Sequence, residues 1–333
     1  MNPSTASARL LADIGGTNAR FAWQESPGAA IELPHTLPAD EHASLADAMQ
    51  QYLQRIGRAA PPACSIAIAN PVVGDQVTMT NHHWTFSIAA LKAQMGFAQL
   101  LVINDFTALA LALPALAPDE LRQVGGGTAR ADHAIALIGP GTGLGVSGLV
   151  PDGLGGWLPL QGEGGHITLA GTTPREHAVL ELIGRRYGHA SAERAVCGQG
   201  LVDIHLALMA LDHPQAVPPQ RAAPEITAAA LDGSDVACVE ALGLFCAFLG
   251  NAAGNLALTL GAKGGVYIGG GIVPRLGAWF DASPFRARFE AKGRFRAYLA
   301  EIPAYVIHAK RSPALLGAAR ALESSAPFAG RAA

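Results

Sequence analysis

The sequence predicts an α/β protein built from two related halves. A short apolar strand, a glycine-rich turn and a second strand follow one another near the N-terminus, and the same unit recurs near the middle of the chain. Apolar residues at helical spacing follow each unit, so strands and helices alternate as in α/β domains. The two units consist of residues 10–14, 15–18 and 19–23, and of residues 134–138, 139–145 and 146–150.

Length and composition predict a globular protein with two domains. Half of the 333 residues are hydrophobic, which is enough apolar surface for a sizeable core. The net charge is -3 and no run of Lys or Arg occurs, so we expect neither a nucleic-acid partner nor a membrane partner. The four cysteines are widely spaced, and the N-terminus lacks an apolar signal core. These features favour a cytoplasmic protein.

Elements of the first half follow from periodicity and capping signals. Apolar residues at helical spacing predict a helix over 44–57, and Ser87 is typical of the cap of a short helix that ends near Gly96. The apolar run 100–103 predicts a buried strand that ends at Asn104 and Asp105. The Ala- and Leu-rich run after Thr107 predicts a helix that stops at Pro114, and residues 65–69 predict another strand.

Elements of the second half carry clear start and stop signals. Thr173-Pro174-Arg175-Glu176 predicts a capping box that opens a helix closed by Gly188. A long helix is predicted from near Asp235 to Gly261. A strand at 266–268, a glycine turn at 269–271, a helix opened by Pro274 and a terminal helix opened by Ser312-Pro313 follow, and residues 117–132 are the best candidate for an interdomain linker.

Three glycine-rich turns, each directly after an apolar strand, predict phosphate binding. Without Cβ atoms, backbone N–H groups can approach an anion closely. A single turn of this kind could equally be an ordinary β-turn, but three are much stronger evidence. The turns span residues 13–18, 139–145 and 269–271, and Thr17, Asn18 and Thr142 add side-chain donors.

Two common nucleotide-binding motifs can be excluded. A P-loop needs Gly-Lys, and this pair does not occur in the sequence. Gly143, Gly145 and Gly148 match the Rossmann spacing, but the prolines and glycines of 146–160 prevent the helix that a Rossmann site requires. Two hairpin turns that grip phosphates remain, with charge neutralised by backbone dipoles and Mg²⁺. Asp13 is placed to bind Mg²⁺ through water, although it could instead stabilise its turn.

Six motifs together carry a family resemblance. They are LADIGGTNARFAW, VINDFTA, IGPGTGLGV, GEGGH, SAER and YIGGGIVP. In this order, and over nearly the whole chain, they resemble the bacterial glucokinases of the hexokinase–actin superfamily. The resemblance implies ATP-dependent phosphorylation of D-glucose to glucose 6-phosphate, the first step of glycolysis, in a homodimer. It also implies two actin-like, ribonuclease-H-like domains flanking an active-site cleft: a smaller domain of residues 1–115 plus 309–333, and a larger one of residues 116–308.

The resemblance assigns roles residue by residue. Asp105 would be the catalytic base, and the sugar ligands would be Asn104, Asp105, Glu163, His166 and Glu193. The ATP-binding residues would be Ala12, Asp13, Ile14, Gly15, Gly16, Thr17, Asn18, Gly141, Thr142, Gly143, Gly269, Gly270 and Gly271, the last three against the adenosine. The cysteine-cluster zinc motif of the related repressor and kinase group is absent from the sequence, as is a helix-turn-helix before the first strand.

The residue types suit this chemistry, and each has a structural alternative. Phosphoryl transfer needs a carboxylate that accepts the proton of the attacking hydroxyl, and Asp105 precedes an apolar helix whose N-terminus favours ionisation while burial opposes it. Asp105 could instead merely cap that helix. His166 could be an ordinary loop histidine, and Glu193 could be an acid that complements a helix dipole.

Other functions remain open at this stage. A kinase of another hexose or of an N-acylhexosamine would carry the same motifs, and a substrate panel would separate these. An actin-like ATPase would hydrolyse ATP without sugar and would need a client-binding or polymer-forming segment, which the sequence does not reveal. A non-catalytic sugar sensor is disfavoured by the presence of Asp105.

Overall fold

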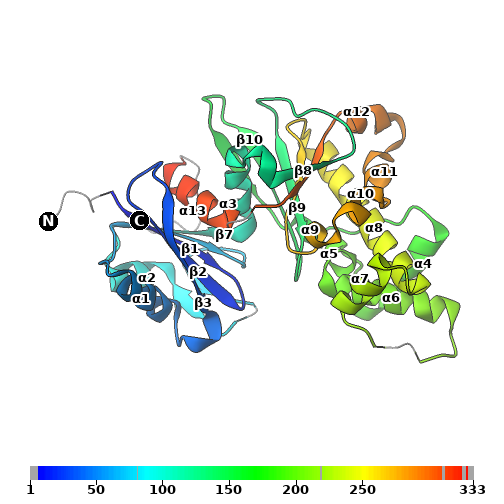
Figure 1. Ribbon diagram of the computed structural model, residues 1–333, viewed down its shortest axis with the longest axis horizontal. Helices are drawn as coiled ribbons and strands as arrows, with labels where there is room; N and C mark the ends of the chain where they lie inside the picture. Colours follow the sequence, from blue (N-terminus) through cyan, green and yellow to red (C-terminus); the bar gives the residue numbers. More distant parts are fainter. Residues whose placement is uncertain (1–6, 81, 218–219, 310–311, 325–327, 329–333) are drawn as a thin grey trace. The chain divides into compact units, whose positions relative to one another are not determined.

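The computed structural model describes residues 7–80, 82–217, 220–309, 312–324 and 328, and Figure 1 shows its elements in order. The chain divides into two compact units. Unit 1 contains residues 1–116, 152–161 and 309–333, and unit 2 contains residues 117–151 and 162–308. Residues 152–161 thus group with unit 1, although we expected them in the larger domain. The proposed functional domain boundaries stay a prediction.

The sheet of unit 1 brings three chain segments to one edge. Its strands are β1 (Arg9–Ile14), β2 (Asn18–Gln24), β3 (Ile31–Pro38), β4 (Ala63–Ile68) and β7 (Gln99–Asn104), in the order β3-β2-β1-β4-β7. β1 and β2 form an antiparallel hairpin, whereas β1, β4 and β7 run parallel with Ile14, Ile68 and Asn104 in register. The turn after β1 and the segment after β7 therefore leave the same edge, where open α/β sheets bind ligands.

Helices pack on this sheet as their sequence signals predict. They are α1 (Leu45–Ile56), α2 (Ile88–Met95), α3 (Asp105–Ala112) and α13 (Pro313–Glu323). Ser44 and Ser87 cap α1 and α2 through their hydroxyl groups, and Gly57 and Gly96 end these helices in the left-handed conformation. The predicted cap at Ser87 and the predicted helix end near Gly96 are therefore confirmed, and the caps of α1 at Ser44 and Gly57 lie at the ends of the predicted helix 44–57. α13 packs against α3 and closes a small apolar cluster over the sheet. The unit also contains β5 (Gln76–Thr78), β6 (Thr85–Ser87) and β11 (Trp157–Gln161).

The sheet of unit 2 repeats this arrangement. Its strands include β8 (Leu121–Val124), β9 (Ile135–Pro140), β10 (Leu144–Pro151), β12 (Val266–Ile268) and β13 (Ala304–Ile307). β9 and β10 form an antiparallel hairpin, β12 runs parallel to β9, and β13 runs parallel to β12. This is the pattern of β1, β2, β4 and β7, so the internal repeat and the α/β class that we predicted are confirmed.

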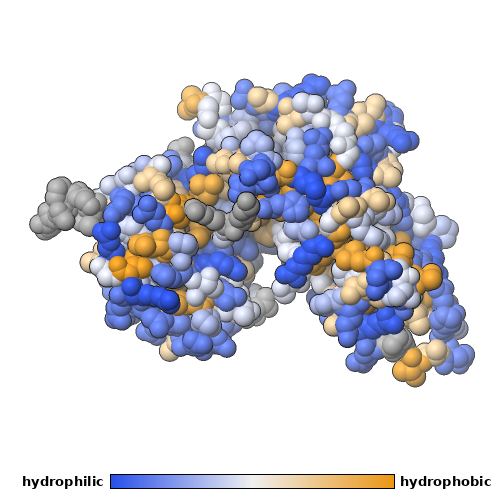
Figure 2. Space-filling model, in the orientation of Figure 1, coloured by the Kyte–Doolittle hydropathy of each residue, from blue (hydrophilic) through white to orange (hydrophobic). Residues whose placement is uncertain are grey.

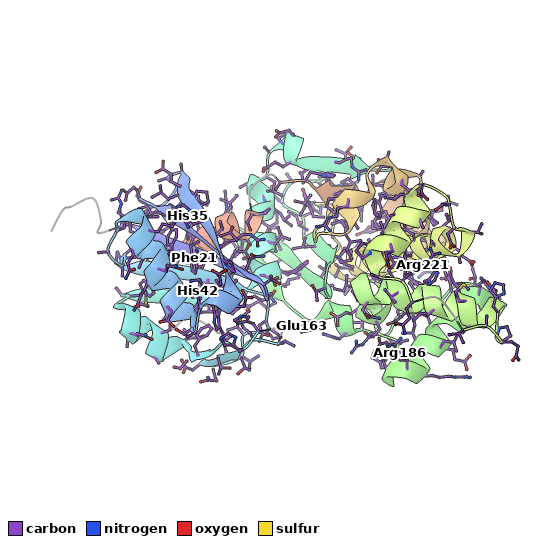
Figure 3. All side chains as sticks on the ribbon, turned by 60° about the horizontal axis from the view of Figure 1, so that its bottom comes forward. Phe21, His35, His42, Glu163, Arg186 and Arg221 are labelled. Carbon is purple, nitrogen blue, oxygen red and sulfur yellow. The ribbon has the colours of Figure 1, made fainter. Side chains whose placement is uncertain are left out.

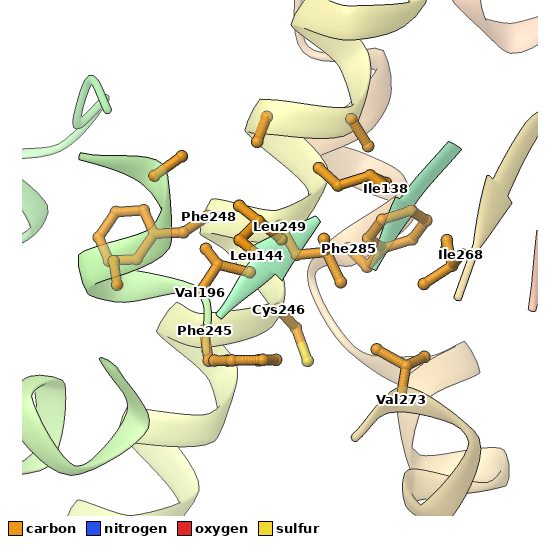
Figure 4. Packing of buried hydrophobic residues seen from close by; sticks show 14 of the residues in the cluster. Ile138, Leu144, Val196, Phe245, Cys246, Phe248, Leu249, Ile268, Val273 and Phe285 are labelled. Carbon is orange, nitrogen blue, oxygen red and sulfur yellow. The ribbon is translucent and has the colours of Figure 1, made fainter. Parts of the chain in front are cut away.

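Unit 2 is built around the long helix α8. Its helices are α4 (Pro174–Tyr187), α5 (Ala192–Ala195), α6 (Gly198–Asp212), α7 (Ala223–Leu231), α8 (Val236–Leu260), α9 (Val273–Leu276), α10 (Ala278–Ala282), α11 (Phe285–Glu290) and α12 (Arg296–Ala300). Figure 4 shows Phe245, Phe248 and Leu249 of α8 close to Leu144 and Phe285 in the buried cluster. This core supports β9 and β10 from one side of the sheet.

Two expectations for unit 2 need correction. Residues 117–132 are not a free linker, because β8 lies within them and pairs with β13. The capping box at α4 is only half formed: Thr173 accepts the N–H of Glu176, but the Glu176 carboxylate binds Thr172 and Arg288 instead of closing the box. The Glu176 carboxylate forms a tertiary ion pair with Arg288, and the spacing of residues in the sequence does not predict this contact.

Within the part of the chain that the structure describes, α8 is the one helix long and apolar enough to cross a membrane. However, 67% of its apolar window is buried inside the protein, as expected for a core helix. The face shown in Figure 2 is mostly hydrophilic, with apolar side chains interspersed. The strongly exposed apolar side chains include Val217 and Leu154, which lie on different segments.

Candidate active site

Asp105 is the first residue of α3, directly after the carboxyl end of β7. Asn104, rather than Asp105, is the N-cap of α3: its Oδ1 accepts the N–H groups of Phe106 at 2.9 Å and Thr107 at 3.2 Å. Asp105 Oδ1 accepts the N–H of Phe106 at 2.9 Å and a hydrogen bond from Asn104 Nδ2 at 3.1 Å. Asp105 is therefore not the N-cap, and Asn104 both caps α3 and holds the Asp105 carboxylate.

The surroundings of Asp105 make it a weak acid. The pKa of Asp105 is raised to about 6, and burial is the larger cause of this rise. The negative charge of Asp13 is the second cause. The hydrogen bonds from the Phe106 N–H and from Asn104 oppose this rise, because they stabilise the carboxylate. At neutral pH the group is therefore mostly ionised and yet partly desolvated, as a general base should be.

Asp13 is buried near the end of β1 and is held by two side chains. Ser312, which precedes α13, donates to Asp13 Oδ2 at 2.7 Å. Arg20, the cross-strand partner of Asp13 in the β1–β2 hairpin, donates to the same oxygen at 3.2 Å. Neither partner was predicted from the sequence. The position of Arg20 could have been found by counting along the hairpin, whereas Ser312 is 299 residues away.

The first glycine turn joins β1 to β2. The N–H of Gly15 donates to the carbonyl of Asn18 at 2.9 Å, and the turn exposes Thr17. Ala12 and Ile14 are fully buried in the sheet. Of the predicted phosphate-binding residues in this segment, Gly15, Gly16, Thr17 and Asn18 are therefore at least partly exposed, while Ala12, Asp13 and Ile14 are buried in the sheet.

The second glycine turn joins β9 to β10 and is braced by its neighbours. The N–H of Gly141 donates to the carbonyl of Gly143 at 2.8 Å, and the N–H of Gly198 at the start of α6 donates to the carbonyl of Gly141 at 2.9 Å. Thr142 is exposed at the tip. These two hydrogen bonds hold the base of the turn, while its tip at Thr142 is open to a ligand.

The third glycine turn, residues 269–271, lies against the second. The N–H of Gly269 donates to the carbonyl of Ile138 at 2.9 Å. Gly270 has φ +77° and passes so close to the Pro140 carbonyl that a Cβ atom there would collide with it. Only glycine fits this position. The predicted phosphate and adenosine segments of unit 2 are therefore side by side.

The predicted sugar-binding segment of unit 2 is a short 3₁₀ turn, η5 (Gly164–His166). Glu163, labelled in Figure 3, directly precedes this turn and His166 is its last residue, and both are exposed. The segment continues into an isolated bridge between Thr168 and Ser191, which places it next to α5. Three predicted sugar ligands from two motifs, Glu163, His166 and Glu193, thus belong to two adjoining segments.

Glu193 has a contact that the sequence did not predict. Its Oε2 accepts the N–H of Leu144 at 2.9 Å, so the carboxylate is bound to the end of the second glycine turn. Glu193 lies in the first turn of α5, as the dipole alternative required, but its hydrogen bond is to a different element. The structure therefore brings a predicted sugar ligand and a predicted phosphate-binding turn into direct contact.

The carboxylates near the glycine turns suit a Mg²⁺ ion that is held mainly by water and substrate phosphates better than they suit a metal ion held by protein ligands alone. Among the described residues there is no group of three or more His, Cys, Asp or Glu side chains that could hold a metal ion. Mg²⁺ usually keeps several waters and takes one or two carboxylates together with substrate phosphates. Asp13, next to the first glycine turn and with its Oδ2 already occupied, could accept from a metal-bound water through Oδ1.

The family can now be assigned. A protein-family model described as Glucokinase matches residues 10–325. The chain belongs to the glucokinase family. The resemblance that the six motifs indicated is thereby confirmed, and the chain is a member of a family of sugar kinases.

Individual relatives agree with this assignment. The glucokinase of Aromatoleum aromaticum is 56% identical over 95% of each chain, and that of Chromobacterium violaceum is 54% identical over 93% of this chain and 88% of its own. Among solved structures, a glucokinase from an Antarctic psychrotroph superposes with a TM-score of 0.86 at 36% identity, covering 96% of this chain and 99% of its own. The fold is therefore that of a two-domain, actin-like glucokinase.

Proposed function

We propose that this glucokinase-family chain transfers the γ-phosphoryl group of ATP to the 6-hydroxyl of D-glucose, with Asp105 as the general base. The observation that carries the proposal is Asp105 itself: a carboxylate at a parallel strand end, held in one orientation by Asn104 and with its pKa raised to about 6. The same reaction would open glycolysis. The names of the relatives that match over most of the chain support glucose as the sugar.

Proton transfer would proceed through a fixed carboxylate. Asp105 would accept the proton of the attacking hydroxyl while the oxygen bonds to the γ-phosphorus and the bond to the β-phosphate breaks. The hydrogen bonds from Asn104 and from the Phe106 N–H both end on Oδ1 of this carboxylate. Oδ2 would therefore take the proton, while Asn104 and the Phe106 N–H keep the group aligned.

Phosphate binding would rely on backbone groups. The whole sequence contains four lysines, and the glycine turns contain none. N–H groups at the turn tips, those of Gly16, Thr17, Thr142 and Gly143, would bind the phosphates, and residues 269–271 would lie against the adenosine. Mg²⁺, when bound through water to Asp13, would neutralise charge on the phosphates.

Sugar recognition would use the polar groups of unit 2. Glu163, His166 and Glu193 offer acceptors and a ring N–H for vicinal hydroxyl groups, and Asn104 is a further candidate from unit 1. However, the Asn104 side chain already makes four hydrogen bonds: two accepted, one donated to Asp105 and one donated to the Asn70 carbonyl at 3.4 Å. Its contribution would therefore lie more in aligning Asp105 than in binding sugar.

A sugar panel tests the proposal. Glucose, fructose, mannose and N-acetylglucosamine are supplied with MgATP, and ADP release is followed for the wild type, Asp105→Asn and the control Asp119→Asn, which changes an exposed acid. We expect the highest kcat/KM with glucose, a loss of about 10²–10⁴-fold in Asp105→Asn, and no change in the control. A higher kcat/KM with another sugar would reassign the substrate, and equal ATP hydrolysis without sugar would indicate an ATPase.

Assembly and location complete the proposal. We expect a homodimer in the cytoplasm, as the family resemblance implies. Light scattering coupled to gel filtration measures the mass directly against the 34.2 kDa of one chain. A particle of that mass at micromolar concentration would contradict the dimer.

A further inference from the structure

Leu144, the first residue of β10, is contacted by both segments that are predicted to bind sugar. Its N–H donates to Glu193 Oε2 at 2.9 Å. Its carbonyl oxygen is approached so closely by Gly165 of η5 that a Cβ atom at 165 would overlap it. The peptide groups on either side of one residue, at the exit of the second glycine turn, therefore fix the positions of α5 and η5.

Gly143 shows that the Glu193 carboxylate fills space inside this turn. A Cβ atom at 143 would overlap Glu193 Oε2, whereas a Cβ atom at Gly141, two residues earlier, would meet nothing within 4 Å. Neither glycine has a positive φ. The restriction at 143 therefore comes from the Glu193 carboxylate and not from backbone strain.

The two sugar segments are also joined to each other. The N–H of Ala192 donates to the carbonyl of Ile167 at 2.9 Å, and the N–H of Leu169 donates to the carbonyl of Ala190 at 3.0 Å. These bonds connect the chain after η5 to the start of α5. A displacement of Glu193 or of the glycine turn would therefore shift the positions of Glu163 and His166 as well.

We propose that Glu193 is a shared residue that couples nucleotide binding to sugar binding. Oε2 holds the second glycine turn through Leu144, and Oε1 accepts a sugar hydroxyl. This inference rests on the proposed function and deepens it. Fixing a carboxylate costs side-chain entropy, so a phosphate that orders the turn lowers the cost of binding sugar. Because coupling is reciprocal, sugar raises the affinity for nucleotide by the same factor.

The first test uses a matched pair of glycine variants. Gly143→Ala pushes the Glu193 carboxylate away from Leu144, while Gly141→Ala adds the same methyl group to the same turn without touching Glu193. Calorimetry measures the glucose Kd in the absence of nucleotide. We expect Gly143→Ala to raise this Kd about tenfold or more, since hydrogen bonds to charged groups are of that strength, and Gly141→Ala to leave it within about twofold of wild type.

The second test is the reverse experiment. Glu193→Ala should raise the Kd of a non-hydrolysable MgATP analogue about tenfold with no sugar present, whereas Glu181→Ala, which removes an exposed acid of α4, should not. Circular dichroism confirms folding of each variant. A glucose Kd unchanged by Gly143→Ala, or an analogue Kd unchanged by Glu193→Ala, would overturn the coupling in an active enzyme. Failure of the wild type to phosphorylate glucose would instead overturn the proposed function.

Discussion

Replacing Asp105 with Asn should make the folded chain more stable at neutral pH while it stops phosphoryl transfer. Asn has nearly the same shape as Asp and can still accept the Phe106 N–H through Oδ1. It carries no charge, so it does not suffer the burial and the repulsion from Asp13 that raise the pKa of Asp105. Function and stability are therefore expected to oppose each other at this residue.

The size of the effect follows from the pKa of Asp105. Folding raises this pKa from 3.8 to about 6, a difference that corresponds to about 3 kcal/mol. The folded state holds the proton more tightly than the unfolded state does, so wild-type stability falls as pH rises from about 4 through 6. Asn does not titrate. The variant should thus match wild type near pH 4 and exceed it by about 1–3 kcal/mol above pH 7.

Calorimetry at pH 5 and pH 8 tests this reasoning. The Tm of Asp105→Asn should exceed that of wild type by about 2–4 °C for each kcal/mol, and the excess should be larger at pH 8. The kcat/KM of the wild type for glucose should fall below about pH 6, by about tenfold per pH unit, as Asp105 takes up its proton. An excess in Tm that does not depend on pH, or a variant less stable than wild type at pH 8, would refute burial as the cause.

Three further predictions concern packing and positioning. Gly317→Ala places a Cβ atom on a carbonyl oxygen of α3 and should destabilise unit 1 by about 1–3 kcal/mol. In Gly243→Ala of α8 the added Cβ atom meets nothing, and the variant should stabilise the protein by up to about 1 kcal/mol. Urea unfolding measures both variants, and equal changes in the free energy of unfolding would contradict this account of the packing. Ser312→Ala removes the donor to Asp13 and should raise the Mg²⁺ concentration for half-maximal activity with little change in glucose KM. If the Mg²⁺ concentration for half-maximal activity did not change, Ser312 would have no role in metal binding. Gly271→Ala should raise the KM for ATP without lowering the Tm, and a loss of Tm instead would indicate a structural glycine.

Much of the fold and of the candidate site could be predicted because the informative contacts are local. A strand, a glycine turn and the returning strand lie within about a dozen residues, so Gly15 and Gly141 were placed correctly at the tips of hairpins. The predicted cap Ser87 acts on an N–H group three residues ahead. Local hydrogen bonding of this kind leaves a signature in short sequence windows.

The unpredicted contacts are those that tertiary packing makes between distant segments. Glu193 reaches Leu144 over 49 residues, and Ser312 reaches Asp13 over 299. Glu176 fitted a local capping box, yet a buried ion pair with Arg288 determined its final position. A carboxylate that lies near several hydrogen-bond donors binds those with the best geometry. Which donors these are depends on tertiary packing, and a short stretch of sequence does not contain that information.

The glycines of unit 2 separate what the fold requires from what a ligand requires. At Gly270 a Cβ atom would strike the Pro140 carbonyl, so the backbone itself excludes a side chain there, whereas at Gly143 a Cβ atom would displace the Glu193 carboxylate. At Gly141 and Gly271 a Cβ atom would meet nothing within 4 Å, and neither residue has a positive φ. Packing and conformation therefore give no reason for glycine at these two positions. An anion that must approach backbone N–H groups closely does give a reason, because any side chain would hold it away. The open space at Gly141 and Gly271 is therefore compatible with the proposed phosphate binding at this edge of the sheet.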